Sequence, residues 1–125
     1  MPTSKELLAA ANAVVPKIGV PEAQALMEKG NVLVVDVRDG TEVAQSGKAE
    51  GAMHVSRGLL EFKADPEAPT HDKAFSKDKT ILLYCGSGGR AALAGKTLKD
   101  MGYTDVRNIG GFKDWVAGGG KIENG

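Results

Sequence analysis

The one cysteine of the chain, Cys85, lies in the segment with the clearest capacity for chemistry. It follows the apolar run 81–84, and three of the next four residues are glycine. Arg90 ends the segment, and residues 91–101 have the pattern of a helix. A nucleophilic sulfur is therefore expected between the end of a buried strand and the start of a helix. There, backbone N–H groups and the positive helix end favour a thiolate and any anion bound to it.

A lone cysteine such as Cys85 is often an inert small hydrophobe in a protein core. A purely structural cysteine, however, needs no glycine-rich turn, no helix start and no arginine after it. Gly86, Gly88 and Gly89 each cost about 0.5–1 kcal/mol relative to alanine in regular structure. This cost favours a loop that must hold an unusual backbone shape, so we interpret Cys85 as a nucleophile.

Arg90 has two interpretations. Its guanidinium is expected either to bind an oxyanion of the substrate or to brace the loop against a carboxylate. Asp36 and Glu42 are the candidate partners for the brace.

The composition predicts one ordinary globular domain over residues 1–125. Sixteen basic and sixteen acidic residues give a formal net charge of zero, which argues against a nucleic-acid or membrane partner. One cysteine excludes an internal disulfide and fits a cytoplasmic location, and we find neither a signal peptide nor a membrane span. Two histidines without close spacing to the cysteine predict no metal site.

Strand and helix patterns alternate along the chain, which predicts an α/β fold with an open, mostly parallel sheet flanked by helices. Residues 1–19 are expected to form a helical extension. Residues 63–79 are polar, contain two prolines and are expected to form a long surface loop, for which a position over the site is one option. The strands suggested by apolar runs are 32–37, 51–55, 80–84 and 105–109, and the helices are about 7–14, 20–30, 41–45, 59–62, 90–101 and 112–117. Ligands bind at the carboxyl ends of such strands, where Cys85 is expected.

The segment 85–90 resembles the active-site loop of the rhodanese homology domain family, which has the pattern Cys-x-x-Gly-x-Arg. The resemblance covers about residues 20–119. Further motifs follow in the family's order: Asp-Val-Arg at 36–38, Glu42, Gly47, Gly-Ala-Met-His-Val at 51–55, Gly102-Tyr103, Val106, and Gly-Gly-Phe-x-x-Trp at 110–115.

The resemblance implies that the open, mostly parallel sheet is five-stranded. It also implies sulfur transfer without a cofactor. The Cys85 thiolate would take the outer sulfur of a donor such as thiosulfate, and the resulting persulfide would pass it to a cyanide, thiol or protein acceptor. The persulfide-binding loop would consist of Gly86, Ser87, Gly88, Gly89 and Arg90. The chain departs from the family's common residues at three places, namely Lys48, Ser56-Arg57 and Ala91, and these departures bear on substrate preference.

Three further charged residues are candidates for the rim of the site. Asp36 and Arg38 end a strand on the active face, and the resemblance also suggests that they brace loops by ion pairing. Arg57 is expected either to bind thiosulfate oxygens at the rim or to be an exposed, solubilising residue.

Two alternatives to a sulfurtransferase are open. Phosphatase and arsenate reductase relatives use a loop one residue longer, Cys-x5-Arg, because a tetrahedral phosphate needs a wider cradle. Only four residues separate Cys85 from Arg90, which favours sulfur. The other alternative is a non-enzymatic module that carries sulfur or binds a partner protein, although inactive relatives usually lose the cysteine.

Overall fold

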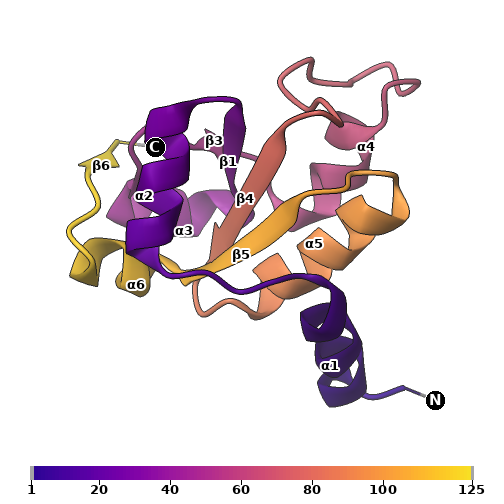
Figure 1. Ribbon diagram of the computed structural model, residues 1–125, viewed down its shortest axis with the longest axis horizontal. Coiled ribbons are helices and arrows are strands. Elements are labelled where there is room, and N and C mark those ends of the chain that lie inside the picture. The colour runs from indigo at the N-terminus through magenta and orange to yellow at the C-terminus, as the bar shows by residue number, and fades with distance from the viewer. Residues whose placement is uncertain (1, 125) are drawn as a thin grey trace.

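The computed structural model describes residues 2–124 and confirms the expected α/β fold. Four parallel strands form the central sheet in the order β3-β1-β4-β5, with helices on both faces (Figure 1). The strands are β1 (Val32–Asp36), β2 (Lys48–Ala49), β3 (Met53–His54), β4 (Thr80–Cys85), β5 (Val106–Gly111) and β6 (Ile122–Glu123). The helices are α1 (Ser4–Val14), α2 (Val20–Lys29), α3 (Gly40–Ser46), the 3-10 turn η1 (Arg57–Leu59), α4 (Leu60–Ala64), α5 (Gly89–Asp100) and α6 (Phe112–Ala117).

The central sheet has four strands, whereas the family resemblance implies five. At the outer edge of β5 the chain forms only an isolated bridge between Lys17 and Asn108. The segment between α1 and α2 is too short to extend this contact, and Pro16 has no N–H to donate. The remaining strands, β2 and β6, pair antiparallel in a separate two-stranded sheet.

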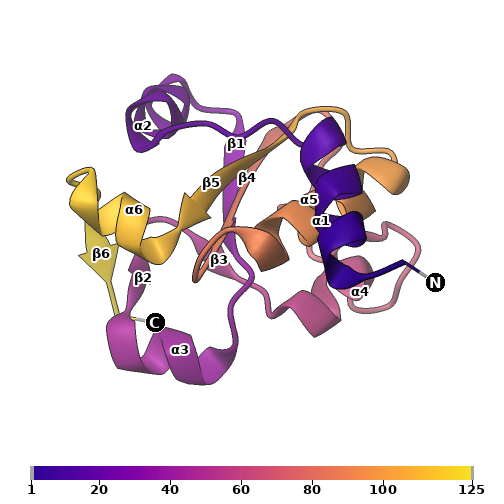
Figure 2. The same ribbon diagram turned by 90° about the horizontal axis from the view of Figure 1, so that it is seen from below.

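Two apolar clusters lie on opposite faces of the sheet. Successive residues of β4 point to alternate faces, so Leu83 and Cys85 join the cluster under α4 and α5, whereas Leu82 and Tyr84 join the cluster under α2 and α6. Figure 2 shows α5 and α6 on either side of the sheet. Burial on both faces explains why β1 and β4 are continuous apolar runs.

The N-terminal helix α1 packs against α5 (Figure 2). It begins with the expected capping box, in which the Glu6 N–H donates to Thr3 Oγ1 at 3.1 Å and the Thr3 N–H donates to Glu6 Oε1 at 3.2 Å. No helix within residues 2–124 combines the length and the apolar character needed to cross a membrane.

The loop that precedes β4 does not cover the carboxyl ends of the strands, contrary to one option left by the sequence. The Asn31 side chain, just before β1, donates to the Asp78 carbonyl at 3.1 Å, which holds the loop at the amino ends. Phe75 is buried in the core, with its ring edge-on to Tyr103 at 6.3 Å. An aromatic residue in an otherwise polar stretch therefore anchors this loop at the far end of the sheet from Cys85.

Candidate active site

The loop between β4 and α5 curls around the sulfur of Cys85. Cys85 is the last residue of β4 and is only 1% exposed. The Gly88 N–H donates to Cys85 Sγ across 3.0 Å, so a backbone dipole points at the sulfur. Gly88 has φ of 105°, a conformation that glycine adopts without the penalty a side chain would cause. This N–H stabilises negative charge on the sulfur.

Gly110 and Gly111 end β5, and Gly111 lies directly against the loop between β4 and α5. The β4–β5 register shifts between Leu83 and Tyr84, so that Cys85 pairs with Gly111. A Cβ atom on Gly111 would lie 2.3 Å from the Gly86 carbonyl oxygen, far inside contact distance. Glycine is therefore required at position 111 for the loop to approach β5 this closely.

Asn108 is a loop-positioning residue that the sequence reasoning missed. Its side chain is buried, donates to the Gly88 carbonyl at 3.0 Å and accepts from the Gly110 N–H at 2.8 Å. The amide thus connects the loop to β5 through hydrogen bonds with two backbone groups. The available signal was an asparagine among the apolar residues of a strand, where asparagine is disfavoured.

Arg90 contacts Glu42 through two parallel hydrogen bonds. Its two terminal nitrogens lie 2.6 Å and 2.9 Å from the two carboxylate oxygens of Glu42, which belongs to α3. The Arg90 hydrogen bonds lower the pKa of Glu42 to about 2, and the carboxylate in turn raises the pKa of Arg90. Of the two roles expected for Arg90, this contact matches the one in which its guanidinium braces the loop against a carboxylate. The partner is Glu42 and not Asp36.

We expect Glu42→Gln to destabilise the protein in a pH-dependent way. Because the folded-state pKa of Glu42 is depressed from 4.5, its contribution is present above pH 4.5 and is lost as the pH falls toward about 2. Both side chains are more than one third exposed, so the difference in unfolding free energy should not exceed about 1 kcal/mol. Thermal unfolding of the wild type and of Glu42→Gln, from about pH 2 to neutral pH, measures this difference. A difference of the same size near pH 2 and at neutral pH would contradict the assignment.

Asp36 and Arg38 form a buried ion pair beneath the mouth of the site. The Asp36 carboxylate accepts from the Arg38 backbone N–H and from its guanidinium, with a shortest contact of 2.8 Å. Arg38 also donates to Ser46 Oγ and to the Gly47 carbonyl, which fixes the end of α3. Burial alone would lower the pKa of Arg38, but the hydrogen bonds and charge of Asp36 outweigh it and raise the pKa. These contacts make the pair a brace between β1 and α3.

Arg57 lies apart from these residues. Its guanidinium donates to Glu61 at 2.9 Å and to Thr97 Oγ1 at 3.0 Å, on the surface between η1, α4 and α5. Thr97 follows Arg90 by seven residues, about 10 Å further along α5. In this conformation Arg57 is directed along α5 and away from the loop. Within residues 2–124, no group of three or more His, Cys, Asp or Glu side chains is arranged to hold a metal ion.

One surface hollow adjoins the loop directly. It has a volume of about 300 Å³, and Gly86 contributes to its wall. Its other lining residues are Arg38, Glu42, Gln45, Ser46, Phe112 and Lys113.

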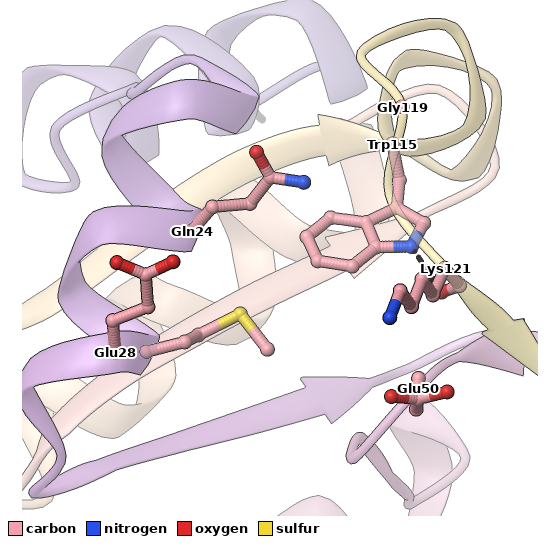
Figure 3. Close-up of a pocket in the computed structure, with 7 residues that line it drawn as sticks. Gln24, Glu28, Glu50, Trp115, Gly119 and Lys121 are labelled. Carbon is pink, nitrogen blue, oxygen red and sulfur yellow. Dashed lines mark hydrogen bonds between the residues drawn. The ribbon is translucent and has the colours of Figure 1, made fainter.

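A second hollow of about 320 Å³ lies between α2 and the C-terminal segment. Figure 3 shows the Trp115 ring at its centre, with Gln24 and Glu28 of α2 on one side and Lys121 on the other. No residue of the loop 85–90 lines this hollow, whereas Gly86 lines the first one.

The model of the rhodanese-like domain family matches residues 20–118. The chain is 27% identical over 108 residues to the thiosulfate:glutathione sulfurtransferase of Homo sapiens, covering 81% of this chain and 93% of that protein. It is 32% identical over 98 residues to a sulfurtransferase of Allochromatium vinosum, covering 78% and 83%. The structure of a Rhodopseudomonas palustris protein of unknown function, described as a possible tyrosine phosphatase, superimposes with a TM-score of 0.91. That protein is 38% identical, and the match covers 98% of this chain and 96% of that one.

Proposed function

The chain belongs to the rhodanese-like domain family, and we propose that it is a sulfurtransferase that moves sulfane sulfur from thiosulfate or a similar donor to a thiophilic acceptor through a persulfide on Cys85. The observation that carries the proposal is the contact between the Gly88 N–H and Cys85 Sγ at the carboxyl end of β4. The thiosulfate sulfurtransferase names of several relatives support the same reaction class.

In the first half-reaction the Cys85 thiolate attacks the outer sulfur of thiosulfate. The S–S bond of thiosulfate breaks, sulfite leaves with the bonding electron pair, and Cys85 becomes an anionic persulfide. In the second, a cyanide or thiolate acceptor attacks the outer persulfide sulfur, and Cys85 leaves as the thiolate. Each step exchanges one bond to sulfur for another, so the proposed reaction needs neither a redox partner nor a cofactor.

The loop has two tasks in this mechanism. The Gly88 N–H stabilises the charge on Cys85 Sγ, and the N–H groups of the rest of the turn 86–89, including Ser87, would stabilise the charge that moves to the outer sulfur. Arg90, held by Glu42, would keep the start of α5 in place. Asn108 would keep the Gly88 peptide in the orientation that presents its N–H to the sulfur.

Phosphatase activity is the second candidate, since the similar R. palustris protein is described as a possible tyrosine phosphatase. Two observations disfavour it here. The loop has only four residues between Cys85 and Arg90, which leaves a narrow cradle for a tetrahedral phosphate. Both terminal nitrogens of Arg90 already donate to Glu42, whereas phosphate recognition would use that guanidinium fork.

A carrier that delivers sulfur to a protein acceptor would use the same persulfide, and the acceptor alone would differ. A cytoplasmic location without nucleic-acid or membrane partners also belongs to this proposal.

The decisive experiment compares three donors side by side: thiosulfate, 3-mercaptopyruvate and p-nitrophenyl phosphate. We expect thiosulfate with cyanide to yield thiocyanate, and the protein treated with thiosulfate alone to be heavier by one sulfur atom that cyanide removes. Double-reciprocal plots should give parallel lines as donor and acceptor vary. Turnover of the phosphate ester with neither sulfur donor active would overturn the proposal in favour of the phosphatase.

A further inference from the structure

The hollow beside Gly86 carries one positive charge that no carboxylate matches. Arg38 is paired with Asp36, and Arg90 is paired with Glu42. Lys113, at the start of α6, is exposed and has no ion-pair or hydrogen-bond partner for its ammonium group within residues 2–124.

Carboxylates near Lys113 are engaged elsewhere. Asp114, its neighbour in the chain, accepts from the Gly111 N–H at 2.9 Å, and Glu42 holds Arg90. A ligand that entered the hollow would therefore meet a free ammonium group on the wall beside the loop.

The other walls of this hollow are held by contacts within the protein. The Phe112 ring lies 4.4 Å from the Arg38 guanidinium carbon and is stacked on Tyr84 at 6.1 Å. Ser46 accepts from Arg38 at 2.9 Å, which fixes the rim that α3 contributes. The hollow thus combines an apolar wall, a fixed polar rim and a flexible cation.

The hollow has room for an acceptor with a carbon body. At about 300 Å³ it has the volume of roughly ten water molecules, more than a compact donor such as thiosulfate requires. An organic thiol with a carbon body and a carboxylate has the matching features. Its apolar part would lie along Phe112, its carboxylate at Lys113, and its sulfur toward Gly86 and the loop.

Building on the proposed sulfurtransferase activity, we propose that this hollow is an acceptor subsite for thiols that carry a carboxylate, and that Lys113 determines the preference for them. The acceptor thiolate attacks the outer sulfur of the Cys85 persulfide, the bond between the two persulfide sulfurs breaks, and the Cys85 thiolate leaves. Lys113 takes no part in this exchange. It holds the acceptor's carboxylate so that the thiolate is presented to the loop.

Three thiols of similar size and different charge test the subsite: 3-mercaptopropionate, 2-mercaptoethanol and cysteamine. Thiosulfate is the donor, and rates are compared at equal thiolate concentration. We expect the wild type to prefer the anionic thiol in kcat/KM. In Lys113→Glu, the ratio of kcat/KM for 3-mercaptopropionate over cysteamine should fall by about tenfold or more, mainly through KM. Added salt should shrink the difference between the two proteins because the lysine is exposed.

Lys121→Glu is the matched control. It makes the same charge change at another exposed lysine, which lines the second hollow and not the first (Figure 3). The ratio should be unchanged in this variant. An equal change in Lys121→Glu would show a general effect of net charge and overturn the assignment, as would a ratio that is unaltered in Lys113→Glu. Thiocyanate formation by the wild type, measured in parallel, separates the two proposals, because its absence would contradict sulfur transfer itself.

Discussion

Cys85→Ser should reduce sulfur transfer from thiosulfate to below about 1% of the wild-type rate, which corresponds to a loss of about 2.7 kcal/mol of barrier stabilisation. A serine hydroxyl cannot form a persulfide, so the first half-reaction has no product. Thiocyanate formation measures the turnover, and mass spectrometry measures the intermediate, which should never appear in this variant.

The fold of Cys85→Ser should persist because the replacement is small and its hydroxyl can still accept from the Gly88 N–H. Circular dichroism and thermal unfolding provide this control. A folded variant with turnover above about 1% would contradict the assignment of Cys85 as the nucleophile.

Asp36→Asn should destabilise the protein by about 3–5 kcal/mol, because it leaves the Arg38 guanidinium buried without its counter-charge. Both side chains are almost fully buried, at 0% and 4% exposure, so water cannot replace the lost carboxylate. Denaturant unfolding measures the change as a shift in the midpoint.

Glu61→Gln is the matched control for this prediction. It breaks the ion pair between Glu61 and Arg57, two side chains that are partly exposed to water. The free energy of unfolding should therefore fall by less than about 1 kcal/mol. If Asp36→Asn costs no more than Glu61→Gln, the buried pair is not the brace that its geometry indicates, and the end of α3 must be held in another way.

The elements that depend on neighbouring residues could be predicted from the sequence. The capping box at Thr3 and Glu6, the buried strand before Cys85, and the helix after the glycine turn are all local features, and the structure contains each of them. Local patterns failed where an element needs a distant partner. The apolar runs located four strands and gave no position for the fifth, and the structure has only an isolated bridge at Lys17 beside β5. The assignment of 1–125 to one domain stays a prediction.

Long-range contacts decided the rest of the site. Glu42 and Arg90 are 48 positions apart, and only the parallel order of β1 and β4 brings the loops after them together. Asn108 meets Gly88, 20 positions earlier in the chain, because β5 pairs with β4 and so lies beside the loop that follows β4. Phe75 anchors the loop that precedes β4 at the amino ends of the strands, because its ring packs against Tyr103.

The sequence by itself determined that the cysteine proposed as the nucleophile lies at the end of a strand, directly before a glycine-rich turn and a helix. Residue type and backbone preference act over a few neighbouring positions, so this arrangement is visible without the fold. Only the tertiary structure decided which charges cancel one another around that cysteine. Arg38 pairs with Asp36, two positions away in the chain, but Arg90 is neutralised by Glu42, which the fold brings to it from 48 positions away. Lys113 has no such partner within residues 2–124. Charge pairing depends on distance in space, and the strand order of the sheet sets that distance.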